Sequence, residues 1–243
     1  QMKEHLHTSI VTVNGKTVGQ NIDNTPIYDP NIISSFEEPF KPDSGIAVVR
    51  GNLAPNGAVL KPSAASKALF KHRGKAVVFE NIEDYHARID SPDLEIDENS
   101  VMVLKNVGPK GYPGMAEVGN MGIPKKLLEK GVKDMVRISD GRMSGTGYGT
   151  VILHVSPESA AGGPLNWVEN GDFIQLDLNN RSIHWEVSDE ELSQRKAANP
   201  IVPVKQIRGY VGLFIDRVEQ AHVGADFDFL KGGSGSKVTR DSH

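Results

Sequence analysis

The sequence predicts an α/β fold in which a barrel-like mixed sheet is flanked by short helices. Short β-branched runs recur along the chain, and most of them end at Gly, Pro, Asn or Asp, as strands do. The helical patterns between them are too few to supply every crossover of a doubly wound sheet, so we expect a sheet that closes on itself. The predicted strands cover residues 9–13, 45–49, 75–79, 101–104, 135–138, 151–155, 173–178 and 182–187.

The last two predicted strands form a β-hairpin. Ile174, Leu176 and Leu178 alternate with polar residues, and the same alternation continues over residues 183–187. The turn-forming pair Asn179-Asn180 lies between the two runs. We therefore expect one face of this hairpin to be buried and the other to contact water.

Two short helices are predicted in the middle of the chain. Asn81 is a candidate N-cap for a helix that ends near residue 89. Pro124 precedes a second helix over residues 125–130, because proline is tolerated at the start of a helix but not inside one.

Two more helices are predicted toward the end of the chain. Ser188 and Glu191 have the spacing of a capping box, which predicts a helix to about residue 197. A further helix is predicted from an apolar stripe with helical spacing. The stripe comprises Val211, Phe214, Ile215, Val218 and either Ala221 or His222.

The chain is predicted to have three parts. Residues 1–44 form an N-terminal segment and connecting arm, since residues 20–44 are turn-rich and weakly apolar. Residues 45–230 form the folded domain. Residues 231–243 form a flexible tail that contains a Gly-Ser run.

Composition excludes several classes of protein. The chain of 243 residues has a formal net charge of −4 without a basic patch, which argues against binding to a phosphate backbone. It contains no cysteine, so it has no disulfide, thiol nucleophile or thiolate ligands of its own for a metal cluster. Neither a membrane-spanning apolar run nor a secretory leader is present, so we expect no membrane partner and a cytoplasmic location.

Familiar nucleotide and hydrolase motifs fail when their spacing is counted. Gly15-Lys16-Thr17 has the ending of a phosphate-binding loop, but Ile10 stands where that loop needs its first glycine. Residues 145–149 fall one position short of a dinucleotide fingerprint. The residues around Ser144 do not form a nucleophile elbow.

Two loops that follow predicted strands carry polar side chains. Residues 108–117 contain glycines and prolines that fix an unusual backbone path. Residues 139–147 follow the next strand and contain Ser, Thr, Asp and Arg. The two loops either converge on one pocket or form tight turns that stabilise the rim of the barrel.

Four ordered motifs resemble the dihydroxy-acid and sugar-acid dehydratase family. They cover residues 51–59, 108–121, 139–146 and 154–158. Within that family the sequence Gly-Tyr-Pro-Gly-Met around Tyr112, together with the Met-Ser-Gly-Thr loop at Ser144, is similar to pentonate dehydratases that act on L-arabinonate or D-xylonate. The resemblance covers the C-terminal part of the family, so it implies a swivelling β/β/α domain over residues 45–230.

The resemblance implies a hydro-lyase that converts a sugar acid to its 2-keto-3-deoxy acid. By this carry-over, Ser144 is the base that removes the C2 proton as an alkoxide, Thr146 hydrogen-bonds to Ser144 or to the substrate, and Glu117 is a Mg²⁺ ligand. An iron–sulfur cluster, expected to be [2Fe–2S], would bind the departing C3 hydroxyl. The cluster ligands belong to the N-terminal domain of the family, so we expect that missing domain as a partner and no activity from this chain alone.

Alternative functions remain open on the sequence alone. The chain also fits a dihydroxy-acid dehydratase of branched-chain amino-acid synthesis, a non-catalytic swivelling domain, or a small-subunit domain that resembles the aconitase-type isomerases. In each enzymatic case the expected ligand is a small-molecule acid and not a nucleic acid. Apolar surface left by the missing domain favours a homo-oligomer.

Overall fold

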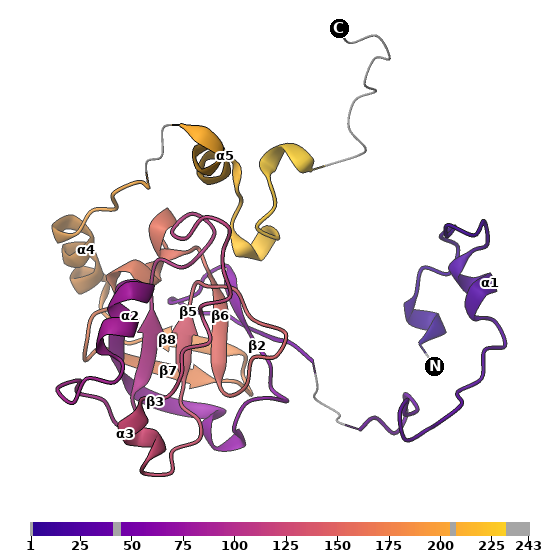
Figure 1. The fold of residues 1–243 in the computed structure, drawn as a ribbon, viewed down its shortest axis with the longest axis horizontal. Coiled ribbons are helices and arrows are strands. Elements are labelled where there is room, and N and C mark those ends of the chain that lie inside the picture. Colours follow the sequence, from indigo (N-terminus) through magenta and orange to yellow (C-terminus); the bar gives the residue numbers. More distant parts are fainter. Residues whose placement is uncertain (1, 41–44, 205–207, 232–243) are drawn as a thin grey trace, which may run out of the picture. The chain divides into compact units, whose positions relative to one another are not determined.

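An eight-stranded mixed sheet, nearly closed into a barrel, forms the centre of the fold (Figure 1). The computed structural model describes residues 2–40, 45–204 and 208–231, and the chain forms two compact units, residues 1–44 and residues 45–243. The sheet has the order β1-β2-β6-β5-β4-β3-β7-β8. Its strands are β1 (Ala47–Val49), β2 (Gly57–Leu60), β3 (Lys71–Phe79), β4 (Val101–Leu104), β5 (Arg137–Ser139), β6 (Val151–Ser156), β7 (Phe173–Asp177) and β8 (Ser182–Trp185). The predicted fold class, a barrel-like α/β domain with short flanking helices, is confirmed.

The two edge strands approach each other at Arg50, directly after β1. The backbone N–H of Arg50 donates to the carbonyl of Arg181 at 3.0 Å, and the N–H of Ile183 donates to the carbonyl of Arg50 at 2.9 Å. Arg50 and Ser182 thereby form an isolated parallel bridge. Because β8 contacts the end of β1 in this way, the two edges of the sheet meet at Arg50 and the barrel is nearly closed.

The four central strands, β3 to β6, run parallel to one another, and the outer strands pair antiparallel. Parallel neighbours end at the same edge of a sheet. The carboxyl ends of the four strands, at Phe79, Leu104, Ser139 and Ser156, therefore lie along one rim of the barrel. The loops that follow β4 and β5 begin side by side on this rim.

Alternate residues of the central strands pack into two separate cores. Ala76 and Val78 of β3 belong to the cluster enclosed by the curved sheet, whereas Val77 and Phe79 belong to a second cluster that includes side chains of the flanking helices. Side chains of a strand point alternately to its two faces, so both faces of β3 are buried. Strand β4 is also buried on both faces, which explains its continuous apolar sequence.

The helices are short. Within the described residues, every helix lacks the length and apolarity that crossing a bilayer requires. The α-helices are α1 (Val18–Ile22), α2 (Ile82–Arg88), α3 (Lys125–Leu128), α4 (Asp189–Ala198) and α5 (Gly209–Arg217). The 3₁₀ helices are Lys3–His5, Lys67–Leu69, Ser159–Ala161, Pro164–Trp167, Ala221–Val223 and Asp228–Leu230.

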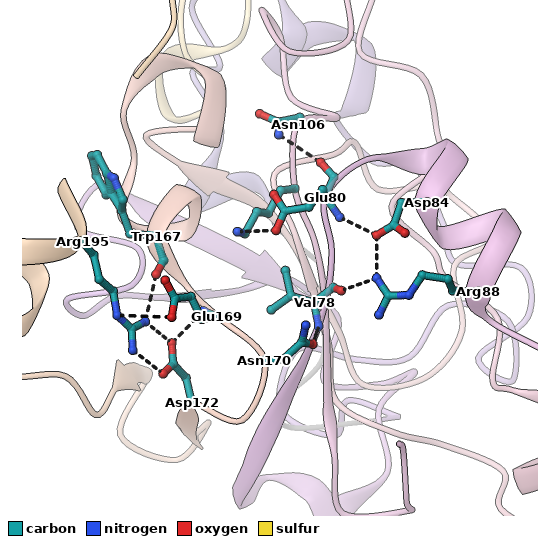
Figure 2. A network of polar contacts seen from close by, with 11 residues as sticks. Val78, Glu80, Asp84, Arg88, Asn106, Trp167, Glu169, Asn170, Asp172 and Arg195 are labelled. Atoms are coloured by element: carbon teal, nitrogen blue, oxygen red, sulfur yellow. Dashed lines mark hydrogen bonds and ion pairs between the residues drawn. The ribbon is translucent and has the colours of Figure 1, made fainter. Parts of the chain in front are cut away.

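Polar networks attach the helices to the sheet (Figure 2). Arg195 of α4 donates to both carboxylate oxygens of Asp172 at 2.6 and 2.8 Å and to the carbonyl of Trp167 at 3.0 Å. Arg88 of α2 donates to the carbonyl of Val78 at 3.2 Å. Since Arg195 and Asp172 are largely buried, their pairing fixes where α4 lies.

The predicted caps and the hairpin are confirmed. The side chain of Asn81 accepts the N–H of Asp84 at 2.8 Å, and the hydroxyl of Ser188 accepts the N–H of Glu191 at 3.1 Å. The carboxylate of Glu191 pairs with Arg195 rather than completing the capping box. Strands β7 and β8 pair antiparallel across the predicted turn.

Other expectations were wrong. Residues 9–13 form no strand; Val11 makes only an isolated bridge with Thr17, because the chain turns back at Gly15, where φ is +80°. The helix expected over residues 211–222 ends at Arg217, where the backbone becomes extended. Strand β2 was not predicted. The predicted tail, residues 231–243, lies outside the described residues except for its first residue.

Candidate active site

Two loops on the rim carry the predicted site residues. We define the glycine-rich loop as residues 105–121, which follow β4, and the serine loop as residues 140–149, which follow β5. Strands β4 and β5 are parallel neighbours, so the loops leave the same edge of the sheet. In α/β sheets this edge is where ligands bind.

Ser144 and Thr146 lie together at the tip of the serine loop. Their hydroxyl oxygens are 3.1 Å apart, and the N–H of Thr146 donates to the Ser144 hydroxyl at 3.4 Å. Ser144 is half-buried and Thr146 is exposed. The Ser144 hydroxyl thus has both a hydroxyl and an amide as neighbours, groups that hydrogen-bond more strongly to an oxygen when it carries negative charge.

Glu117 is exposed on the glycine-rich loop, and its carboxylate lies 3.5 Å from the guanidinium of Arg142 on the serine loop. The backbones of the two loops also pack against each other. A Cβ at Gly141 would lie 3.0 Å from a methyl group of Val107 and 3.3 Å from the backbone of Gly119. The structure therefore places the loops of Glu117 and Ser144 side by side.

Asp140 anchors the beginnings of both loops. Its side chain is fully buried and accepts the N–H of Val107 at 2.9 Å and the N–H of Ser159 at 2.8 Å. Burial raises the pKa of the Asp140 carboxyl, and the backbone hydrogen bonds oppose that rise. Because both oxygens are used, Asp140 ties the segments after three strands to one point.

Glu158 fixes the backbone of the glycine-rich loop by hydrogen bonds. Its buried carboxylate accepts the N–H groups of Lys110 and Gly111, both at 2.9 Å, and the side-chain amide of Gln220 at 2.6 Å. Burial raises the pKa of Glu158. A Cβ at Gly108 would come within 2.6 Å of this carboxylate, so the approach requires glycine at that position.

Arg137 joins the far ends of the two loops. Its buried guanidinium donates to the carbonyl of Met121 at 2.7 Å and to the carbonyl of Tyr148 at 3.0 Å, and it pairs with Asp134 at 3.0 Å. Burial lowers the pKa of Arg137, and Asp134 acts in the opposite direction. A cation with two carbonyl partners and a carboxylate remains charged in this position.

Lys61 and His154 contact the backbone around Ser144. Lys61 donates to the carbonyls of Ser144 and Gly145 at 3.0 and 2.6 Å, and His154 accepts the N–H of Met143 at 2.9 Å. Both side chains line a pocket of about 510 Å³ to which Ser144 also contributes.

The described residues do not by themselves form a magnesium or cluster site. Among the described residues, no three His, Asp or Glu side chains are grouped to hold a metal ion. Glu117 offers one carboxylate, and its nearest charged partner is Arg142. The absence of cysteine leaves no thiolate for an iron–sulfur cluster.

Sequence reasoning predicted Ser144, Thr146 and Glu117 but missed the residues that hold their loops. Asp140 and Glu158 were part of the quoted motifs, and each stands within two residues of a strand end. An acidic residue directly after an apolar strand is a usable signal, because its carboxylate lies near the exposed N–H groups of adjacent loops. Lys61 and Arg137 gave no comparable local signal.

Comparisons with known proteins identify relatives over nearly the whole chain. A family model described as dihydroxy-acid/6-phosphogluconate dehydratase C-terminal matches residues 31–225. An L-arabinonate dehydratase from Rhizobium leguminosarum bv. trifolii is 56% identical over 98% of this chain and 41% of its own length. A 6-deoxy-6-sulfo-D-gluconate dehydratase from Pseudomonas putida is 44% identical over 96% of this chain and 41% of its own length. A dihydroxy-acid dehydratase from Acetivibrio thermocellus is 40% identical over 92% of this chain and 40% of its own length.

Proposed function

The chain belongs to the dihydroxy-acid/6-phosphogluconate dehydratase family through its C-terminal domain, and we propose that it is the C-terminal domain of a sugar-acid dehydratase. It spans about 41% of the length of relatives named L-arabinonate and L-arabonate dehydratase, so the reaction, the substrate and the partner domain are all part of this proposal. The observation that carries the proposal is the juxtaposition of Ser144 with Thr146 beside the loop of Glu117.

We propose a pentonate as the substrate. Relatives named L-arabinonate and L-arabonate dehydratase share 56% of their residues with this chain, and the sulfogluconate dehydratase shares 44%. Four relatives named dihydroxy-acid dehydratase share 37 to 40%. Higher identity to the enzymes of sugar acids supports this class over the branched-chain dihydroxy acids, which remain the alternative.

In the proposed reaction Ser144 removes the proton from C2 of a 2,3-dihydroxy acid. The C3 hydroxyl takes up one proton and leaves as water, which balances the proton that Ser144 removes, and the resulting enol tautomerises to a 2-keto-3-deoxy acid. A serine hydroxyl is a weak acid, so its alkoxide requires hydrogen-bond donors and positive charge nearby. Thr146 supplies a hydroxyl and an N–H at the Ser144 oxygen.

Two cofactors remain part of the proposal for the complete protein. We propose that Mg²⁺ binds there with Glu117 as one ligand and that a [2Fe–2S] cluster is present. Mg²⁺ prefers hard oxygen ligands, and a bound cation lowers the pKa of oxygen groups near it. All cluster ligands and the other magnesium ligands would come from outside this chain. We also propose that the complete protein acts in the cytoplasm.

A chimeric enzyme tests the proposal. This chain would replace the matching 41% of the Rhizobium L-arabinonate dehydratase, whose residues are 56% identical to it. We expect the chimera to form the 2-keto-3-deoxy acid from L-arabinonate and to be less active on a branched-chain dihydroxy acid. Ser144→Ala should lower kcat by roughly 10²- to 10⁴-fold, the usual contribution of a positioned general base.

The matched control is Ser193→Ala, which removes a hydroxyl from α4, far from the serine loop in the sequence. This variant should retain the activity of the chimera. The 243-residue chain alone should show no turnover of L-arabinonate or D-xylonate, because it has no cysteine for the proposed cluster and its described residues contain no group of three potential metal ligands. A chimera that folds but stays inactive on every sugar acid, or a fully active Ser144→Ala variant, would contradict the proposal.

A further inference from the structure

We propose that Lys61 and His154 are positioning residues that clamp the backbone on both sides of Ser144. This inference rests on the proposed function, because it concerns the same serine. Neither residue belongs to the glycine-rich loop or the serine loop. Lys61 follows β2, and His154 lies within β6, so the clamp joins two antiparallel strands to a loop that begins after β5.

Lys61 holds the carbonyl side of the clamp. Its ammonium group donates to the carbonyl oxygens of Ser144 and Gly145, at 3.0 and 2.6 Å. Hydrogen bonds from a charged donor are shorter and stronger than neutral ones. Lys61 is half-buried, and these two carbonyls replace water that its ammonium group would otherwise bind.

His154 holds the amide side of the clamp. Its ring Nε2 accepts the N–H of Met143 at 2.9 Å, and its own backbone N–H donates to the carbonyl of Gly141 at 3.0 Å. His154 has φ +56°, and the pairing of β2 with β6 shifts register close to it, between Gly57 and Val59. A side chain in the left-handed region of a strand is uncommon and marks a bulge that redirects that side chain.

Together the contacts fix three consecutive residues, 143 to 145. The backbone around Ser144 is held by an acceptor on one side and by a cation on the other. A hydroxyl that must meet a C2 proton repeatedly in one geometry needs such support, because a displacement of about 1 Å can cost roughly 10²-fold in rate. The ammonium of Lys61 also places a positive charge at the backbone of Ser144, and positive charge nearby favours the ionised form of a hydroxyl.

The clamp requires a neutral His154, since an imidazolium ion has no lone pair to accept the N–H of Met143. Burial lowers the pKa of His154, and the charge of Arg142 lowers it further. The other titratable side chains that line the same pocket are Arg50, Lys61 and His222. Among the described residues that line this pocket none is acidic, so no carboxylate there favours the imidazolium ion.

Nuclear magnetic resonance and amide exchange on the 243-residue chain test the clamp without substrate. We expect the Met143 amide shift to titrate together with the ring of His154, at a pH below the ordinary histidine pKa of about 6.5. His154→Leu should speed exchange of the Met143 amide at least 10-fold, and His154→Gln, which keeps an acceptor, should restore part of the protection. Lys61→Met should speed exchange of the amides of residues 144–147, and Lys61→Arg should reverse that effect.

His222→Leu is the matched control. His222 lines the same pocket, but its ring bonds to Ser156 and not to the serine loop. This variant should leave the Met143 amide unchanged. A Met143 amide that does not follow the titration of His154 in the unaltered chain would overturn the proposal even if every variant failed to fold.

The same variants in the chimera separate the clamp from the proposed function. Lys61→Met and His154→Leu should lower kcat more than they change KM, and Lys61→Arg should recover activity. If the Met143 amide titrates with His154 in the chain but the unaltered chimera is inactive, the proposed reaction is contradicted and the clamp is supported. Normal kcat in both variants would overturn the clamp as an aid to the reaction.

Discussion

Two buried carboxylates hold the backbones of the loops by hydrogen bonds. Asp140 and Glu158 accept backbone N–H groups from segments that would otherwise place unpaired donors inside the rim. A buried backbone donor without a partner costs about 1–3 kcal/mol. These two acids thus stabilise the loop conformations that bring Glu117 and Ser144 onto adjacent segments.

Asp140→Asn should lower the free energy of unfolding by roughly 1–3 kcal/mol, because one oxygen becomes an NH₂ group that opposes a backbone N–H. The pH dependence has a definite sign. The raised pKa of Asp140 means that the folded protein keeps its proton longer than the unfolded chain, so wild type loses stability as pH rises from the ordinary carboxyl pKa through the raised value.

The difference in unfolding free energy between wild type and Asp140→Asn should therefore be largest at acid pH and shrink as pH rises. Urea unfolding at several pH values measures it. The control is Asp93→Asn, since Asp93 is exposed. A gap that widens with rising pH would show that the electrostatic reasoning about Asp140 has the wrong sign.

Gly141→Ala should destabilise the protein by about 1–3 kcal/mol, the usual cost of overpacking. The added Cβ would press on Val107 and on the backbone of Gly119. Gly145→Ala is a matched control in the same loop, because a Cβ there meets nothing within 4 Å. Thermal unfolding of the two variants compares them directly, and equal losses would mean that the loops are not packed as described.

At the scale of elements, helix α4 depends on its N-terminal cap. Ser188→Ala removes the acceptor for the N–H of Glu191 and should cost about 1 kcal/mol. Ser193→Ala should be neutral or slightly stabilising, since its hydroxyl bonds to a carbonyl within the helix and alanine is the better helix former. Unfolding in urea distinguishes the two substitutions, and a larger loss for Ser193→Ala would refute the role of the cap.

Elements with local signals were predictable, and those that depend on distant partners were not. The caps at Asn81 and Ser188 and the turn of the β7–β8 hairpin are encoded within a few residues. Strand β2 is stabilised by pairing with β1 and β6, which lies almost 100 residues away along the chain. The stripe that predicted a helix to residue 222 is real in composition, but Val218 instead pairs with Phe227.

The candidate site shows the same division. Ser144, Thr146 and Glu117 stand in motifs that can be recognised by their order along the chain. Lys61 and His154 each make two hydrogen bonds to the serine loop, and the strand spacing that brings them there appears only when the sheet is formed. A sequence pattern does not encode a bulge whose partner strand is far away.

At the scale of the whole molecule, apolar side chains on α5 remain exposed. Tyr210 is 72% and Leu213 is 48% exposed. Exposed apolar groups favour association with another surface. Light scattering of the concentrated chain should give a mass above the 26.4 kDa of one copy, and Tyr210→Ser with Leu213→Ser should reduce it. A strict monomer at high concentration would contradict this expectation.

The guanidinium of Arg137 holds carbonyl oxygens in both loops at once. The glycine-rich loop and the serine loop are thus coupled mechanically rather than merely adjacent. A displacement of either loop would therefore act on the other through this guanidinium. A substitution of Arg137 would therefore release both loops at once, although Arg137 belongs to strand β5 and to neither loop.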